Sequence, residues 1–232
     1  MVTVAASAAL VSGCGDSRGD PPSRPAGGPA ITSCVTSAGV LVADLNGDGA
    51  ADRVSAPSPP GDGLTLTFGA EDGRVTKVRP RDLVGHDAQD AEDVLAVVAD
   101  FDRDGWNDLF VVATPESGGD DPRPPDVSEL RLGPFSARGR GQSDHHVSLS
   151  EPRALAVADY NHDRYPDLAS YGHQGDGVYE VTARLGGEKG LDAETDTTNR
   201  RYSQDVTGTD DRGSVPQARP TAFQPPCDGG SG

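Results

Sequence analysis

Short apolar runs alternate with polar, glycine- and proline-rich turns from about residue 35 to residue 200. At residues 64–68 leucine and phenylalanine alternate with threonine, as expected for a strand with one buried face. Residues 109–113 form the most apolar of these runs, as expected for a central strand. These short β-branched runs lack the 3.6-residue period of an amphipathic helix. The pattern therefore predicts an all-β fold.

An acidic loop follows an apolar strand at three places in the chain. The loops begin at Asp44, Asp100 and Asp159, each directly after a Val-Ala pair, and each ends on a further aspartate. They recur at a spacing of roughly 60 residues, which suits one repeated unit of a propeller or an array. The repeats cover about residues 35–90, 91–148 and 149–205. We expect a β-propeller-type array of about three four-stranded blades, open or incomplete.

Each loop presents oxygen-bearing side chains at its positions 1, 3, 5 and 9. Converging carboxylates would repel one another without a cation, and hard oxygen ligands at this spacing suit Ca²⁺, with the backbone carbonyl of position 7 as a further ligand. The candidate ligands are Asp44, Asn46, Asp48, Ala50 and Asp52, then Asp100, Asp102, Asp104, Trp106 and Asp108, then Asp159, Asn161, Asp163, Tyr165 and Asp167. The sequence therefore predicts up to three bound Ca²⁺ ions.

The three loops should bind Ca²⁺ with unequal strength. The second loop has four aspartates and Gly105 at the sharp turn, whereas the first has Asn46 in place of one aspartate. The third has Asn161 and also Arg164 where the other loops have glycine. A left-handed backbone at that position costs a non-glycine residue about 1–2 kcal/mol. We expect the second loop to bind most tightly and the third most weakly.

An EF-hand is the competing interpretation of an acidic loop of this kind. An EF-hand needs an acid at position 12 and a helix on each side. Position 12 is occupied by Ser55, Val111 and Ser170, and the flanking runs are strands. The EF-hand interpretation therefore fails on both requirements.

A second element recurs after each loop, namely a strand that ends on an apolar residue and a glycine. The three copies end at Phe68-Gly69, Leu132-Gly133 and Leu185-Gly186. Together with the loops, these strands resemble the FG-GAP/VCBS repeats of integrin α subunits and bacterial surface proteins. The resemblance implies a β-propeller whose loops bind calcium. Three blades are fewer than the four to eight of closed propellers, so a degenerate fourth blade, an open array and an associating fragment are all open alternatives.

The charge of the chain limits its partners. The 232 residues carry 37 Asp and Glu against 20 Lys and Arg, which gives a net charge of −17. No basic cluster is present that could neutralise phosphates, so nucleic acid is excluded as a partner. Bound Ca²⁺ would cancel part of the negative charge. The length suits one domain with a substantial core.

The start of the chain carries an export pattern. Residues 1–14 form a short apolar run that ends in a small-residue site at Cys14, and residues 11–14 resemble a bacterial lipobox. The resemblance implies that Cys14 is lipidated and anchors the protein to the outer face of the cytoplasmic membrane. An ordinary buried cysteine is the alternative. Residues 15–33 have the composition of a disordered tether, and the Arg-Gly-Asp tripeptide at residues 18–20 is expected to be a chance match.

Two further cysteines remain once Cys14 is lipidated. Cys34 and Cys227 are an even pair in an exported chain and lie at the two ends of the repeat domain, residues 34–227. We expect a disulfide between them that joins the first and last parts of the array, ahead of a disordered tail at residues 228–232. The entropic model gives such a bond an upper bound of roughly 5 kcal/mol.

Three other segments carry expectations of their own. Residues 115–126 are rich in proline and acids, which predicts an exposed insertion. Residues 144–146 read as a polar turn before a strand at residues 147–149, with His145 and His146 not ligating a metal. Residues 171–177 read as a turn in which His173 faces solvent.

No catalytic signature is present in the sequence. There is no Gly-x-Ser-x-Gly elbow and no His-Glu-x-x-His pattern, and the export and disulfide assignments leave no cysteine nucleophile. We therefore expect a non-enzymatic, surface-anchored module that binds a protein or a glycan, with calcium in a structural role. The alternatives are a secreted or surface hydrolase or lyase and a remnant structural domain without a ligand.

Overall fold

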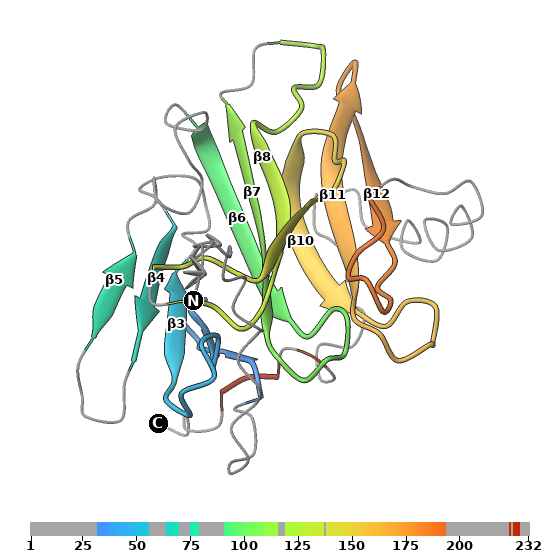
Figure 1. Cartoon of the computed structure of the whole chain (residues 1–232). Coiled ribbons are helices and arrows are strands. Elements are labelled where there is room, and N and C mark those ends of the chain that lie inside the picture. Colours follow the sequence, from blue (N-terminus) through green and yellow to red (C-terminus); the bar gives the residue numbers. More distant parts are fainter. Residues whose placement is uncertain are drawn as a thin grey trace, which may run out of the picture.

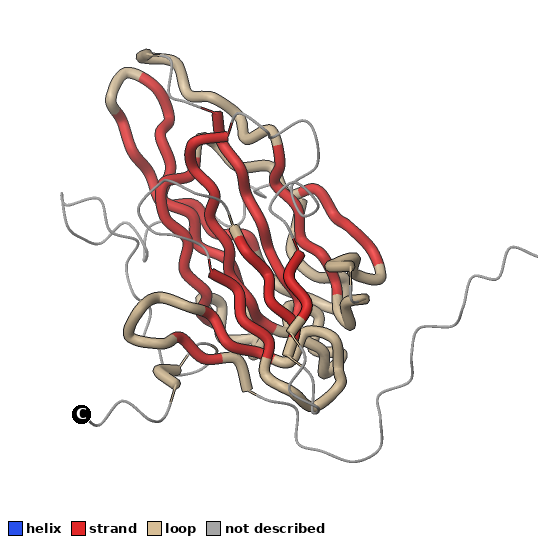
Figure 2. The backbone as a smooth tube through the Cα atoms, turned by 90° about the vertical axis from the view of Figure 1, so that its left-hand side faces the viewer, coloured by secondary structure: helices blue, strands red, loops and turns tan. Residues whose placement is uncertain are grey.

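The computed structural model describes most of the repeat region. The described residues are 32–55, 64–69, 75–78, 91–115, 119–136, 138–193, 223 and 225–227. Within these ranges the chain forms twelve strands and no helix (Figure 2). The predicted signal segment with Cys14, most of the tether and the tail at residues 228–232 lie outside the described residues. No described segment is a helix long and apolar enough to cross a membrane.

The strands form three antiparallel sheets in chain order (Figure 1). The first contains β1 (Cys34–Val35), β2 (Leu41–Ala43), β3 (Asp52–Ser55), β4 (Thr65–Phe68) and β5 (Thr76–Val78). The second contains β6 (Ala91–Ala99), β7 (Asp108–Pro115), β8 (Val127–Leu132) and β9 (Ser143–His146). The third contains β10 (Pro152–Ala158), β11 (Asp167–Gly175) and β12 (Val178–Arg184). The molecule is therefore all-β, as predicted.

The number of strands per sheet differs from the predicted four. The described residues give sheets of five, four and three strands, and the three sheets do not close into a ring. The first sheet gains a strand because residues 34–35 pair with β2. In the third repeat, the residues after 193 lie outside the described part of the chain. The arrangement is that of an open array, in which β6 lies beside both β2 and β10.

Two hydrophobic layers hold the sheets together. Along β7 the side chains of Leu109, Val111 and Ala113 face the first sheet, where they pack with Val54 and Leu66. The intervening side chains, Phe110 and Val112, face the third sheet. The strand at residues 109–113 is therefore buried on both faces, and it lies between β6 and β8 inside its sheet, as predicted for a central strand.

Two local predictions are wrong. The polar residues 143–146 are the edge strand β9, and residues 147–149 follow it as irregular backbone. Residues 171–175 belong to β11 rather than to a turn, and His173 is buried, with only 4% of its surface exposed. In the first case a solvent-facing edge strand has no apolar alternation, and in the second a distant carboxylate stabilises the buried imidazole.

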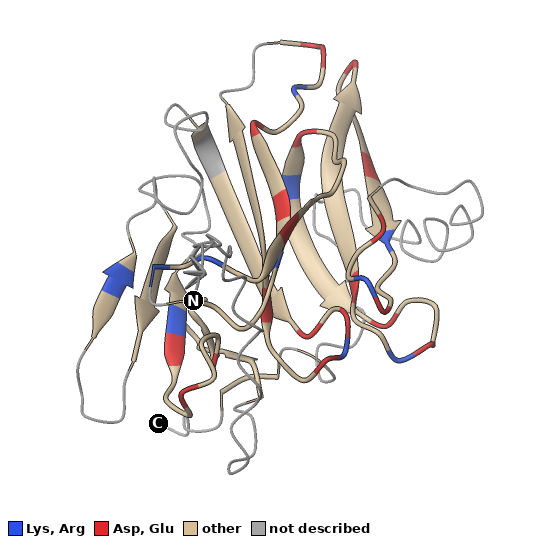
Figure 3. Cartoon of the chain, in the orientation of Figure 1, with Lys and Arg blue, Asp and Glu red and all other residues tan. Residues whose placement is uncertain are grey.

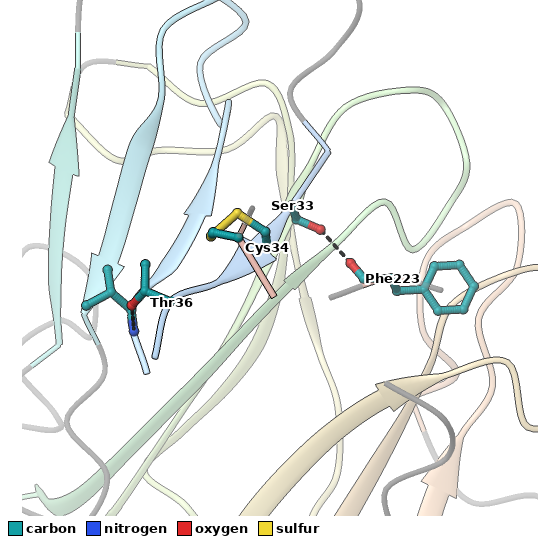
Figure 4. Close-up of a disulfide and its surroundings, with 6 residues drawn as sticks. Ser33, Cys34, Thr36 and Phe223 are labelled. Carbon is teal, nitrogen blue, oxygen red and sulfur yellow. Dashed lines mark hydrogen bonds between the residues drawn. A yellow bond between two sulfur atoms is a disulfide. The ribbon is translucent and has the colours of Figure 1, made fainter. Parts of the chain in front are cut away.

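The two ends of the domain meet at the first sheet. Cys34 and Cys227 form a disulfide with an S–S distance of 2.06 Å across a sequence separation of 193. Beside it, Val35 N donates to Pro225 O at 2.9 Å and Cys227 N donates to Val35 O at 3.0 Å. The Ser33 hydroxyl donates to Phe223 O at 2.7 Å (Figure 4). Residues 225–227 therefore extend the edge of the first sheet beyond β1.

Candidate calcium loops

The acidic loops connect β2 to β3, β6 to β7 and β10 to β11, and the two strands beside each loop pair in the same register. In every case the alanine before position 1 pairs with the aspartate at position 9. The pairs are Ala43 with Asp52, Ala99 with Asp108, and Ala158 with Asp167. All three loops consequently lie at the same end of the array, the lower end in Figure 1, and Figure 3 shows their Asp residues gathered there.

The aspartate at position 9 holds three strands together. It is completely buried in each loop. One of its oxygens accepts the backbone N–H of loop position 2, and the other accepts the N–H of the glycine that follows the next strand. The aspartates are Asp52, Asp108 and Asp167, the position-2 donors are Leu45, Phe101 and Tyr160, and the glycines are Gly69, Gly133 and Gly186. The distances are 2.7–2.9 Å.

This contact explains why a glycine ends each of those strands. A Cβ atom on Gly69, Gly133 or Gly186 would lie 2.5, 2.4 or 2.1 Å from the carbonyl oxygen of loop position 8. A side chain at these positions would therefore force the loop and the strand apart. The recurrent Phe-Gly and Leu-Gly endings are part of the loop architecture.

The backbone is left-handed at two positions of each loop. At position 6, φ is 83° for Gly49, 94° for Gly105 and 78° for Arg164, which agrees with the expected strain at Arg164. Position 4 is also left-handed, with φ of 72° at Gly47, 58° at Arg103 and 65° at His162. The positive φ at position 4 could not be predicted from the sequence, because arginine and histidine give no signal of a left-handed backbone.

The second loop concentrates acidic oxygens. Carboxylate oxygens of Asp100, Asp102 and Asp108 all lie within 4.8 Å of one another. Asp104, the predicted ligand at position 5, is not part of this group, and its Oδ1 accepts the Trp106 N–H at 2.8 Å. The Asp100 Oδ2 atom accepts the Gly105 N–H at 3.1 Å, whereas its Oδ1 is buried without a hydrogen-bond partner. A buried, unsatisfied carboxylate oxygen is costly, and a Ca²⁺ ion, which takes oxygen ligands, fits this donor set.

The first and third loops use their position-1 aspartates differently. Asp44 accepts the N–H groups of Gly47 and Gly49 at 2.7 and 3.0 Å, one on each oxygen. Asp159 accepts those of Asp163 and Arg164, both at 3.0 Å. Neither aspartate keeps an orphaned oxygen. The second loop is accordingly the best candidate for a cation site.

The side chains at positions 3 and 5 form the same turns in all three loops. In each, the Oδ1 atom of position 3 accepts the N–H of position 5, and the Oδ1 atom of position 5 accepts the N–H of position 7. The position-3 and position-5 acceptors are Asn46 and Asp48, Asp102 and Asp104, and Asn161 and Asp163, and the position-7 donors are Ala50, Trp106 and Tyr165. Asparagine and aspartate at position 3 therefore accept the same backbone hydrogen bond and differ only in charge.

Burial destabilises the ionised carboxylates in the absence of a cation. Burial raises the pKa of Asp108 to about 8, more than its backbone hydrogen bonds lower it. Burial likewise raises the pKa of Asp52 and of Asp167 to about 6. The pKa of Asp100 is also raised to about 6, first by burial and then by the nearby charges of Asp104 and Asp102. A bound cation would favour the charged form of all four groups.

A polar cluster that the sequence analysis missed lies near the opposite ends of β10 and β11. Glu151 is fully buried, and its Oε2 lies 3.2 Å from His173 Nδ1 and accepts the Arg123 N–H at 2.9 Å. Its Oε1 contacts the Arg153 guanidinium. The cluster ties the exposed 119–126 segment to the third sheet. A single glutamate before a proline gives no signal that separates it from an exposed acid.

The two histidines of β9 lie apart from the acidic loops. His145 lies 3.0 Å from the Ser143 hydroxyl through its Nε2, and Asp144 Oδ1 lies 3.8 Å from the Arg131 guanidinium. Both histidines lie on the edge strand, and the acidic group of the second loop is at a different place.

Comparison with known proteins adds no assignment. No protein-family model matches the chain, and no curated protein sequence is significantly similar to it. The resemblance to FG-GAP/VCBS repeats therefore depends on the repeated loops and strand endings themselves.

Proposed function

We propose that the protein is a calcium-stabilised, β-propeller-type interaction module displayed on the bacterial cell surface. The observation that carries the proposal is the buried, unpartnered Oδ1 of Asp100, which lies in a group of three converging carboxylates. The same loop architecture recurs in the first and third sheets. The lipidated Cys14 would supply the anchor, and the net charge of −17 fits an exported protein that binds cations.

Calcium has a structural role in this proposal. The buried Asp108 ligates from β7 and is hydrogen-bonded both to the start of its own loop and to the end of β8. A cation held by Asp100, Asp102 and Asp108 would therefore fix the ends of three strands at once. The first and third loops have the same connections and would act in the same way, with fewer charges.

A ligand at the cell surface is the proposed purpose of this scaffold. The clustered carboxylates that could act as catalytic acids and bases belong to the candidate calcium loops. Glu151 makes internal contacts with His173, Arg123 and Arg153. We therefore favour a protein or glycan ligand over a substrate. A hydrolase or lyase activity and a domain with no ligand are the alternatives to be tested.

Calcium binding is tested by thermal unfolding of the mature domain. We expect millimolar Ca²⁺ to raise Tm relative to chelator, because a ligand that binds only the folded state stabilises it in proportion to the logarithm of its concentration over Kd. Extracellular calcium modules typically bind at about 10⁻⁴–10⁻³ M. Mg²⁺ at the same concentration controls for ionic strength. A Tm that is indifferent to chelator and to Ca²⁺ would refute the cation loops.

The ligand and the anchor need separate experiments. A glycan array and a pull-down of surface proteins with the mature domain, each in Ca²⁺ and in chelator, would identify a partner, and the absence of any specific partner would favour the domain without a ligand. Metabolic labelling with a palmitate analogue should mark the wild type and not Cys14→Ser. Label retained in that variant would remove the lipid anchor from the proposal.

A further inference from the structure

Neighbouring cation loops contact each other at the same relative positions. The ring of Trp106, at position 7 of the second loop, occupies the space beside Gly47, at position 4 of the first. A Cβ atom on Gly47 would lie 2.1 Å from Trp106 Cζ3. One repeat further on, Arg103 at position 4 of the second loop lies 5.3 Å from the centre of the Tyr165 ring at position 7 of the third. An aromatic residue of each later loop therefore covers the preceding loop.

The second repeat also donates hydrogen bonds to the backbone at the start of the first loop. The side chain of Asn107 donates to the carbonyl oxygen of Asp44, position 1 of the first loop, at 3.0 Å, and this bond is buried. The N–H of Phe135 donates to the carbonyl oxygen of Leu45 at 2.7 Å. Positions 7 and 8 of the second loop thus hold positions 1 and 4 of the first loop.

The second and third loops do not have the equivalent of the buried Asn107 hydrogen bond that joins the first two. Position 8 of the third loop is Pro166, which has no side-chain donor to replace Asn107. The remaining contact pairs the Arg103 side chain with the Tyr165 ring, and exposed cation–π pairs contribute about 0.5–1 kcal/mol. Arg103 is exposed. The row of loops is therefore joined firmly at one junction and loosely at the other.

We infer that Trp106 and Asn107 couple the first two cation loops, so that Ca²⁺ in either loop raises the affinity of the other. The inference depends on the calcium binding proposed above. Trp106 contributes a candidate carbonyl ligand to the second loop and its ring to the first, so ordering of one loop restricts the other. Coupling between binding sites is reciprocal and typically changes affinity by about 5–150-fold.

The coupling can be measured with proteins in which single loops are disabled. Asp44, Asp100 and Asp159 occupy position 1 and each accepts the N–H of position 6, so replacement by asparagine is a matched loss of one charge in each loop. Asp159→Asn leaves the first two loops intact, and adding Asp100→Asn or Asp44→Asn leaves one of them intact. Calorimetric titration with Ca²⁺ then gives the affinities of each loop alone and of the pair.

We expect the product of the two association constants in the paired protein to exceed the product of the single-loop constants by about fivefold or more. Trp106→Leu should abolish this excess, and Asn107→Ala should reduce it in a protein whose aromatic contact is kept. Binding with independent constants would overturn the coupling and leave the calcium proposal intact. No binding by any variant would overturn both.

Trp106 also provides a readout that needs no substitution at the junction, because it is the only tryptophan in the chain. In the protein that retains only the first loop, Ca²⁺ should still change the Trp106 emission, since the ring rests on Gly47. In the protein that retains only the third loop, with Asp44→Asn and Asp100→Asn, the emission should not change. A silent tryptophan in a first-loop protein that binds Ca²⁺ by calorimetry would contradict the inference.

Discussion

The residue at position 3 is charged in the second loop and neutral in the first and third, although it makes the same hydrogen bond to the backbone in all three. Asp102 and Asn161 both accept the N–H of position 5 through Oδ1, at 3.1 and 3.0 Å. The Asn161 side chain also donates to Asp163 at 2.8 Å. Asp102→Asn should therefore keep the turn, relieve repulsion without Ca²⁺ and weaken Ca²⁺ binding. We expect a higher Tm in chelator and a smaller gain in Tm on adding Ca²⁺.

The reverse change in the third loop is the matched control. Asn161→Asp should lower Tm in chelator and enlarge the gain that Ca²⁺ produces, because it adds a carboxylate to the candidate ligands. Equal Ca²⁺-dependent gains in Asp102→Asn, Asn161→Asp and the wild type would show that position 3 does not ligate the ion.

Arg164 is a non-glycine residue with a left-handed backbone at a turn position that glycine occupies in both other loops. Its φ of 78° is matched by glycine in both other loops. Arg164→Gly should stabilise the protein by up to about 1 kcal/mol, since the strain of about 1–2 kcal/mol is partly offset by the entropy of glycine in the unfolded chain. Urea unfolding in chelator measures the change. Gly49→Ala, at φ of 83°, should destabilise, and a neutral result for both would contradict the argument.

The buried Asp108 makes stability depend on pH in an unusual direction for a carboxylate. Its pKa is raised by burial from 3.8, the value of an unperturbed aspartate, to about 8 in the folded protein, so between these values the folded state binds more protons than the unfolded state. Stability in chelator should therefore fall as pH rises from about 4 to 8. Urea midpoints at pH 5 and pH 8 test this, and saturating Ca²⁺ should flatten the difference. A midpoint in chelator that is higher at pH 8 would contradict the prediction.

At the scale of the element, the hairpin and its third strand act as one unit. Gly186 donates to the buried Asp167, and a Cβ there would lie 2.1 Å from the Pro166 carbonyl oxygen, whereas nothing lies within 4 Å of a Cβ on Gly187. Gly186→Ala should destabilise by about 1–3 kcal/mol, as other substitutions that overfill a packed site do. Gly187→Ala should be close to neutral. Chemical unfolding of the two neighbours measures the contrast, and similar losses in both would argue against the close approach.

The elements that sequence analysis predicted are those with local signals. Residues 64–68 alternate apolar and polar side chains, and residues 109–113 are all apolar, so the sequence of each strand indicates how it is buried. The candidate ligands of each loop likewise lie within nine consecutive residues. β9 has no such signal, because all four of its residues are polar and it forms only by pairing with β8. His173 was misassigned because Glu151, which stabilises it, lies 22 positions away in a different strand connection.

At the scale of the molecule, the first sheet ends the array on one side. In β3 the side chains of Asp52 and Val54 are buried and those of Arg53 and Ser55 are exposed, and Lys77 of β5 is exposed as well. A face of this polarity does not suit a further packed sheet. The number of strands in each sheet depends on which segments pair with one another, as β1 does with β2. This pairing has no signal in the sequence, so sheets of five, four and three strands were not predicted.

The disulfide is the principal long-range restraint. The thiols of Cys34 and Cys227 should be unreactive when the exported protein is counted under denaturing, non-reducing conditions. Replacing both by serine should lower Tm, with roughly 5 kcal/mol as the upper bound of the entropic model. Cys14→Ser should leave Tm unchanged. Two reactive thiols in exported material, or an unchanged Tm in the double variant, would contradict this role.

The same bond determines how the molecule responds to being pulled. A force applied to the chain before Cys34 and after Cys227 passes directly through the sulfur–sulfur bond, so residues 35–226 between them carry no tension. Without the bond, the load would reach the short strand β1 first and peel the first sheet from its edge. In the oxidised protein, pulling on the two flanking segments therefore leaves the three sheets without load.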